Sequence, residues 1–156
     1  MDATVLATIA RPLILVHSVC AILLVGASTR HALVAIDYGR GRYKVHVGHV
    51  FAATTAALYV ATMTLGALVY PTYRYYVRGG YLDRHALWAS RLFDVKEDLA
   101  VLGALAAVGA WILSSAVDAK SDRAQRTIYA ALVWIVPAVV WFDVFSGLVI
   151  TMVRSV

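Results

Sequence analysis

Residues 12–29 read PLILVHSVCAILLVGAST, a stretch that contains no acidic residue, lysine or arginine. An α-helix rises about 1.5 Å per residue, so this stretch alone would be about 27 Å long. The hydrocarbon core of a bilayer is about 30 Å thick, which such a helix nearly crosses. The stretch therefore predicts a membrane-spanning helix, which the surrounding apolar sequence extends to residues 8–36.

Three further apolar stretches follow, at residues 45–70, 99–117 and 127–153. Each is long enough to cross a bilayer as a helix, and polar segments separate them. The sequence therefore predicts an all-α integral membrane protein, a four-helix bundle with up-down-up-down topology. Little sequence remains outside these spans, so we expect a single transmembrane domain over residues 1–156.

The longest connection, residues 72–98, is rich in tyrosine and arginine, as is typical of the headgroup layer of a membrane. Its segment 81–93 alternates apolar with charged side chains, as an amphipathic helix lying on a membrane does. The apolar members are Leu82, Leu87, Trp88 and Leu92, and the polar ones are Asp83, Arg84, His85 and Arg91. We therefore expect a short interfacial helix in the second loop.

The composition supports lipid as the solvent. Hydrophobic residues make up 62% of the chain and charged residues 15%, against about 45–50% and about 25% in ordinary soluble domains. The net charge of +5 is explained by lysines and arginines beside anionic headgroups, so no nucleic-acid partner is expected. Cys20 is the single cysteine, which excludes an intrachain disulfide and any site built on a cysteine pair.

Ionisable side chains inside a bilayer are costly, so each one is a functional candidate. In or beside the predicted spans they are His17, His31, His46, His49 and Asp143. His17 and His31 are fourteen residues apart, which places them on one helix face about 21 Å apart along the axis. Because the second span returns antiparallel, counting from the connecting loop brings His46 and His49 level with His31.

This placement suits haem, whose iron takes two axial ligands from opposite sides, and imidazole is a common ligand. His31 with His46 or His49 would hold one haem b. Arg30 and Arg42 lie at the same predicted surface and would bind the haem propionates.

A second haem is also geometrically compatible with the spacing. The counting that matches His31 to His49 brings Met63 level with His17, and methionine is a haem ligand as well. His17 and Met63 would then hold a haem near the middle of the membrane.

Two other interpretations of His31, His46 and His49 remain open. Three imidazoles close to one surface could bind zinc or copper without haem, since imidazole suits both metals. Alternatively, the three histidines simply lie in the membrane interface.

Asp143 lies deep in the fourth predicted span, at about the depth of His17. The two are expected to meet as a pair that transfers protons, orients the imidazole beside a haem, or serves a quinone site. In the alternative interpretation, a protonated Asp143 bonds to a backbone carbonyl left free by Pro137.

The four-span size, the fourteen-residue spacing of His17 and His31, and the added His46 and His49 resemble the four-helix membrane cytochromes b. These include the haem-bearing anchor subunits of quinone-linked dehydrogenases. The resemblance implies an oxidoreductase subunit that transfers electrons between a quinone or quinol pool and a redox partner protein. The third and fourth spans contain no histidine, a departure from a family that usually takes ligands from several helices.

Two functions outside redox chemistry compete with a cytochrome. His17 and Asp143 could form the relay of a proton or metal-ion transport component, or the chain could be a structural subunit of a larger complex without its own cofactor. In each case we expect a bacterial inner membrane protein in contact with lipid, and an oligomer or neighbouring membrane subunits could supply missing ligands.

Overall fold

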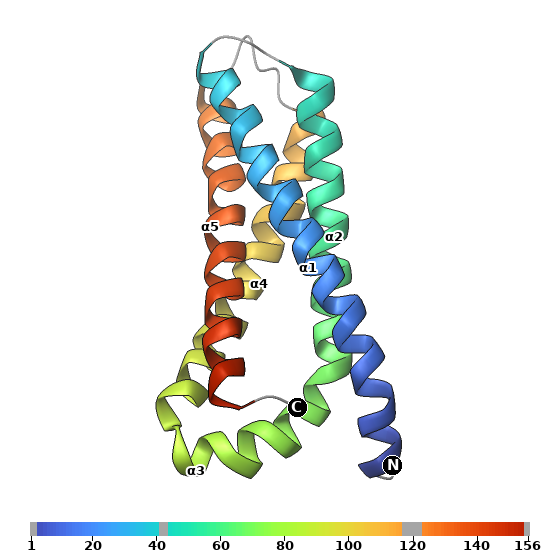
Figure 1. The fold of residues 1–156 in the computed structure, drawn as a ribbon. Coiled ribbons are helices and arrows are strands. Elements are labelled where there is room, and N and C mark those ends of the chain that lie inside the picture. The colour runs from blue at the N-terminus through green and yellow to red at the C-terminus, as the bar shows by residue number, and fades with distance from the viewer. Residues whose placement is uncertain (1–2, 41–43, 117–122, 155–156) are drawn as a thin grey trace.

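The computed structural model describes residues 3–40, 44–116 and 123–154, and these residues are almost entirely helical. The long helices are α1 (Ala3–Gly39), α2 (Val45–Tyr73), α4 (Leu87–Ala116) and α5 (Arg123–Val153). A π-helical stretch, η1 (Arg74–Leu82), and a single turn, α3 (Asp83–His85), connect α2 to α4. The predicted all-α fold is confirmed, and Figure 1 shows the long helices side by side.

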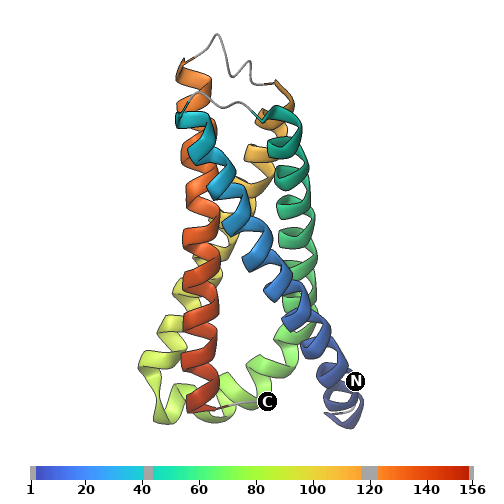
Figure 2. The same ribbon diagram turned by 45° about the horizontal axis from the view of Figure 1, so that its top comes forward.

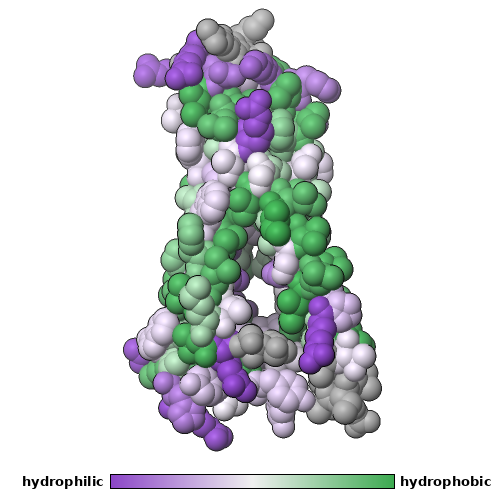
Figure 3. All heavy atoms as spheres, viewed as in Figure 1, coloured by the Kyte–Doolittle hydropathy of each residue, from purple (hydrophilic) through white to green (hydrophobic). Residues whose placement is uncertain are grey.

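All four long helices are long and apolar enough to cross a membrane. Large apolar side chains cover their outer surface; Ile22 is 71% and Leu105 66% exposed. Figure 3 shows this apolar surface between two ends that carry the hydrophilic residues. Leaving so much apolar area in water would be unfavourable, so lipid is its solvent and the chain is an integral membrane protein.

The bundle has two different ends. At one, here called the loop end, α1 and α4 finish while α2 and α5 begin (Figure 1). At the other, called the η1 end, η1 runs across the bundle, as the turned view in Figure 2 also shows. Each long helix packs mainly on two others, because α1 and α4 both lie between α2 and α5.

Small residues let the helices approach closely in the middle and at the loop end. The central cluster contains Leu24, Ala56, Tyr59, Ala106, Ala107, Val136 and Val140. The cluster at the loop end contains Ala32, Ala35, Tyr38, Ala110, Tyr129 and Val133. A third cluster, under η1, contains Val77, Leu82, Ala86, Ala89 and Ile150.

Two residues near the end of α1, Asp37 and Tyr38, contact Lys44, which directly precedes α2. The Lys44 ammonium lies 2.8 Å from the Asp37 carboxylate. The Tyr38 hydroxyl donates to the backbone oxygen of Lys44 at 3.3 Å. The end of α1 is thereby connected directly to the start of α2.

The region before the third span differs from the prediction. α4 begins at Leu87 rather than at residue 99, so the charged residues 94–98 lie within the helix. The interfacial helix expected over residues 81–93 is not one element, because Ala86 (φ −148°, ψ 58°) interrupts it. Residues before Ala86 complete η1 and α3, and those after it start α4. An ion pair from Arg78 of η1 to Asp94 of α4, described below, compensates for one of these charges.

Candidate functional site

The interior polar side chains lie on two levels, and the first is at the loop end. His31 of α1 is 2% exposed, and its Nε2 lies 2.8 Å from the Tyr129 hydroxyl of α5. The Tyr38 ring packs beside Tyr129 with 5.8 Å between centroids. His31, Ala35 and Tyr38 are spaced four and three residues apart, which places all three on the buried face of α1.

His49 of α2 is fixed by a different helix. Its Nδ1 lies 2.9 Å from the Ser114 hydroxyl of α4. Ser114 donates its one proton to the Trp111 backbone oxygen at 2.6 Å, so its oxygen accepts from His49. This network assigns a proton to Nδ1 of His49, and in the neutral imidazole Nε2 keeps a lone pair.

The structure does not gather the loop-end histidines into one site. His46 is exposed, while His31 and His49 have partners on α5 and α4 respectively. Within the described ranges, no three His, Cys, Asp or Glu side chains come close enough to hold a metal ion.

A haem beside His31 requires a flat slot between helices. In this fold the Tyr129 ring lies 5.9 Å from the His31 ring, centroid to centroid, and Tyr38 packs on Tyr129, so a porphyrin would fit only if Tyr129 moved away. Of the expected propionate ligands, Arg30 lies 6.0 Å from the centre of the Phe51 ring. Arg42 lies outside the described residues.

The second level lies towards the η1 end, where His17 joins α1 to α2. Its Nδ1 is 3.0 Å from the Thr62 backbone oxygen and donates a hydrogen bond to it. Gly66 leaves room for the ring, since a Cβ there would stand 3.3 Å from the His17 Cε1. Met63, the expected ligand opposite His17, is 40% exposed on the apolar outer surface.

Lys96 of α4 reaches α5 at this level, one turn from Asp143. Lys96 Cε is 3.7 Å from the place a Cβ on Gly147 would take, one turn beyond Asp143. Lys96 is close enough to act electrostatically on both Asp143 and His17. Three ionisable side chains from three helices, the interior trio His17, Lys96 and Asp143, therefore share one region of the bundle.

Figure 3 shows the molecule hollowed in its lower half, on the side of the η1 end. The opening separates the side formed by α5 from the side formed by α1 and α2 in the same view as Figure 1. The interior trio belongs to these helices and to α4, on the same half of the bundle.

Unpartnered polar atoms continue from this region towards the middle. Asp143 Oδ1, the Tyr59 hydroxyl and Thr55 Oγ1 are buried and have no hydrogen-bond partner in the described part of the chain. Tyr59 reaches from α2 to Gly103 of α4, where a Cβ would collide with its hydroxyl, and it lies within electrostatic range of Asp143. Buried polar groups of this kind are usually hydrogen-bonded to internal water.

Sequence reasoning placed Lys96 in a loop and overlooked Tyr59 and Tyr129. A signal for Lys96 exists, because it precedes the buried Gly103 by seven residues, two helical turns on the same face. If the small-residue face of α4 is extended towards the start of the helix, Lys96 falls on the same inward face as Gly103. The neighbouring acidic residues concealed this pattern.

Comparison of the chain with protein-family models, with curated proteins and with solved structures finds no match. The interior side chains are therefore the evidence from which a function can be inferred.

Proposed function

We propose that the protein conducts protons through the interior of its helix bundle, as a small transport protein or as a subunit of a larger complex in a bacterial inner membrane. The observation that carries this proposal is the interior trio. Ionisable side chains within membrane spans are rare, and they commonly mark ion pathways or proton relays.

The chemistry of the trio suits proton transfer rather than metal binding. Lys96 brings a positive charge, which opposes cation binding at Asp143. His17 uses Nδ1 to donate to Thr62, so the neutral imidazole keeps a lone pair on Nε2 that can accept a proton. Asp143 has an unpartnered oxygen that can accept or deliver one.

The unpartnered hydroxyls of Tyr59 and Thr55 would carry protons onward from the interior trio. Tyr59 and Thr55 are one turn apart on α2, and Thr55 is the nearer of the two to the loop end. Beyond them lie the His31–Tyr129 pair and Tyr38, whose hydroxyl reaches the Lys44 carbonyl. Polar groups bridged by water would therefore extend from the trio to the loop end.

A flux measurement tests the proposal. The purified protein is reconstituted into liposomes that enclose a pH-sensitive dye, and a potassium diffusion potential drives proton uptake. Asp143→Asn removes a proton-transfer group and should slow uptake by about 10²-fold, because a positioned acid or base typically contributes that much.

The matched control is His46→Ala, because His46 is exposed and outside the route. This variant should conduct as the wild type does. Wild-type liposomes no leakier than empty ones, or an Asp143→Asn variant with undiminished uptake, would show that the proposal is wrong.

A b-type cytochrome that exchanges electrons with quinone is the second candidate. The observation in its favour is that His31 and His49 both face inward at the same end of the bundle. Bound haem b would supply one-electron transfer, after Tyr129 had moved from the His31 ring. The absorption spectrum of detergent-purified protein reduced with dithionite tests it: a sharp α band lost in His49→Ala supports this function, and the absence of the band excludes it.

A further inference from the structure

A cavity of about 340 Å³ opens at the η1 end, and none of the interior trio lines it. Its walls are formed by Tyr70, Arg74, Arg78, Gly79 and Asp83. We propose that this cavity binds the phosphate of a membrane lipid headgroup, with Arg74 as the residue that contacts it.

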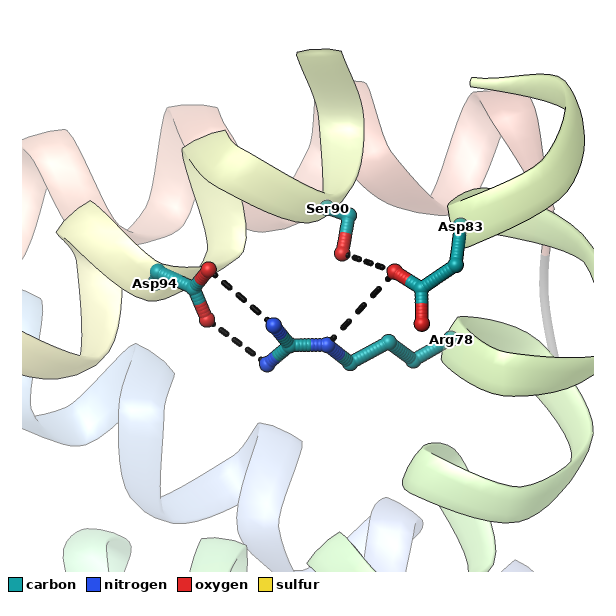
Figure 4. A network of polar contacts seen from close by, with 4 residues as sticks. All are labelled: Arg78, Asp83, Ser90 and Asp94. Atoms are coloured by element: carbon teal, nitrogen blue, oxygen red, sulfur yellow. Dashed lines mark hydrogen bonds and ion pairs between the residues drawn. The ribbon is translucent and has the colours of Figure 1, made fainter. Parts of the chain in front are cut away.

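One wall of the cavity is held rigidly by Arg78. Its two terminal nitrogens donate to the Asp94 carboxylate at 2.6 and 3.0 Å (Figure 4). Its Nε lies 3.8 Å from Asp83 Oδ1, which also accepts a 2.6 Å hydrogen bond from the Ser90 hydroxyl. This network neutralises Arg78 and fastens η1 to the first turns of α4, so the cavity exists before a ligand arrives.

Arg74 is the arginine of the cavity whose positive charge is not neutralised by a carboxylate of the described residues. It is exposed, and none of the carboxylates in the described ranges forms an ion pair with it. It lies about one turn before Arg78, so both line the same cavity. The cavity therefore combines an unneutralised guanidinium with a neutralised, fixed one, and guanidinium groups bind phosphate with good geometry.

The wide turn of η1 shapes this wall. A Cβ on Gly79 would stand 3.3 Å from the Arg74 backbone oxygen, and one on Gly80 the same distance from that of Tyr75. Side chains at either position would crowd the π-helical turn, so the two glycines let the backbone close around the cavity.

The position of the cavity selects a lipid as the source of the phosphate. η1 crosses the end of four membrane-spanning helices, which is where headgroups lie (Figures 1 and 2). Tyr75 and Tyr76 are exposed on the same segment, as aromatic residues are at membrane interfaces.

Binding of a short-chain phosphatidylglycerol to the detergent-purified full chain tests the proposal. Native mass spectrometry gives the fraction of protein with bound lipid across a titration. Arg74→Gln should raise the dissociation constant at least about tenfold, whereas Arg74→Lys keeps the charge and should raise it less. Arg11→Gln, an exposed arginine near the start of α1 that does not line the cavity, should leave it unchanged.

Parallel titrations with short-chain diacylglycerol and with inorganic phosphate identify the ligand. Diacylglycerol should bind much more weakly, because it lacks the phosphate. Inorganic phosphate that binds as tightly as the lipid would overturn the lipid assignment. An equal effect of Arg11→Gln and Arg74→Gln would overturn the site.

Discussion

Lys96 and Asp143 place opposite charges inside an apolar bundle, near enough for electrostatic attraction. Removing one leaves its partner charged in surroundings of low polarity, which is unfavourable. The contributions of the two residues to stability are therefore coupled, although they come from different helices.

We predict that Lys96→Met and Asp143→Leu each lower the free energy of unfolding by about 1–3 kcal/mol, because each leaves the opposite charge inside the bundle without its partner. The double variant should lose clearly less than the sum of the two single losses. Unfolding in detergent by titration with sodium dodecyl sulfate measures all three. Strictly additive losses would mean that the two charges do not interact.

The Tyr129 hydroxyl is the partner of a histidine with almost no access to solvent. Tyr129→Phe should therefore lower the free energy of unfolding by about 1–3 kcal/mol, the cost of an unsatisfied buried group. Tyr75→Phe is the control, since Tyr75 is 72% exposed and its variant should unfold as the wild type does. If both variants behave alike, the His31–Tyr129 hydrogen bond has no role in stability.

At the scale of elements, the contact between α2 and α4 depends on a missing side chain. Gly103→Ala would drive a methyl group into the Tyr59 hydroxyl and the Val139 side chain, so the helices must separate. We predict a loss of about 1–3 kcal/mol in the free energy of unfolding, as overpacked cores show.

Gly26→Ala is the matched control for this prediction. A Cβ at Gly26 meets nothing within 4 Å, and alanine favours a helix by about 0.5–1 kcal/mol over glycine. This variant should be as stable as the wild type or more so in the same denaturation experiment. Equal destabilisation by both alanines would contradict the close packing at Gly103.

The positions of most helices could be predicted from the sequence, because twenty or more apolar residues in a row have few alternatives to a membrane span. The start of α4 could not. Charges at Asp94 and Lys96 normally mark a loop, and only the ion pair from Arg78 and the inward direction of Lys96 explain their place in a helix.

The candidate site was predictable only in part. His17, His31 and Asp143 were identified because ionisable side chains are rare within membrane spans, and helical periodicity gave their depth and face within one helix. It does not say which neighbouring helix a side chain meets. The partners of His31 and His49, Tyr129 and Ser114, therefore became known only from the structure.

The described helices pack closely near the loop end, and the molecule is hollowed towards the η1 end (Figure 3). Close packing near the loop end follows from the packing of Tyr38, Tyr129 and Val133 between the helices. The interior trio belongs to the helices around this opening, so we predict that the opening contains water rather than lipid.

Cysteine labelling tests this prediction, because maleimides react with thiolates and water promotes their formation. In a Cys20→Ala background, Gly147→Cys should react with a water-soluble maleimide in liposomes, since residue 147 lies beside Lys96. Leu148→Cys should not react, because Leu148 faces outward into lipid. The reverse order of reactivity would rule out a hydrated interior.

The two contacts of Lys44 with the end of α1 have a consequence for insertion of the protein into the membrane during synthesis. Because Asp37 and Tyr38 both bind Lys44, the two helices close a short loop at little entropic cost. They can therefore enter the membrane as a finished hairpin while α4 and α5 are still being synthesised. The ribosome would deliver the His17 half of the interior first, and Lys96 and Asp143 would arrive together in the second hairpin, formed by α4 and α5.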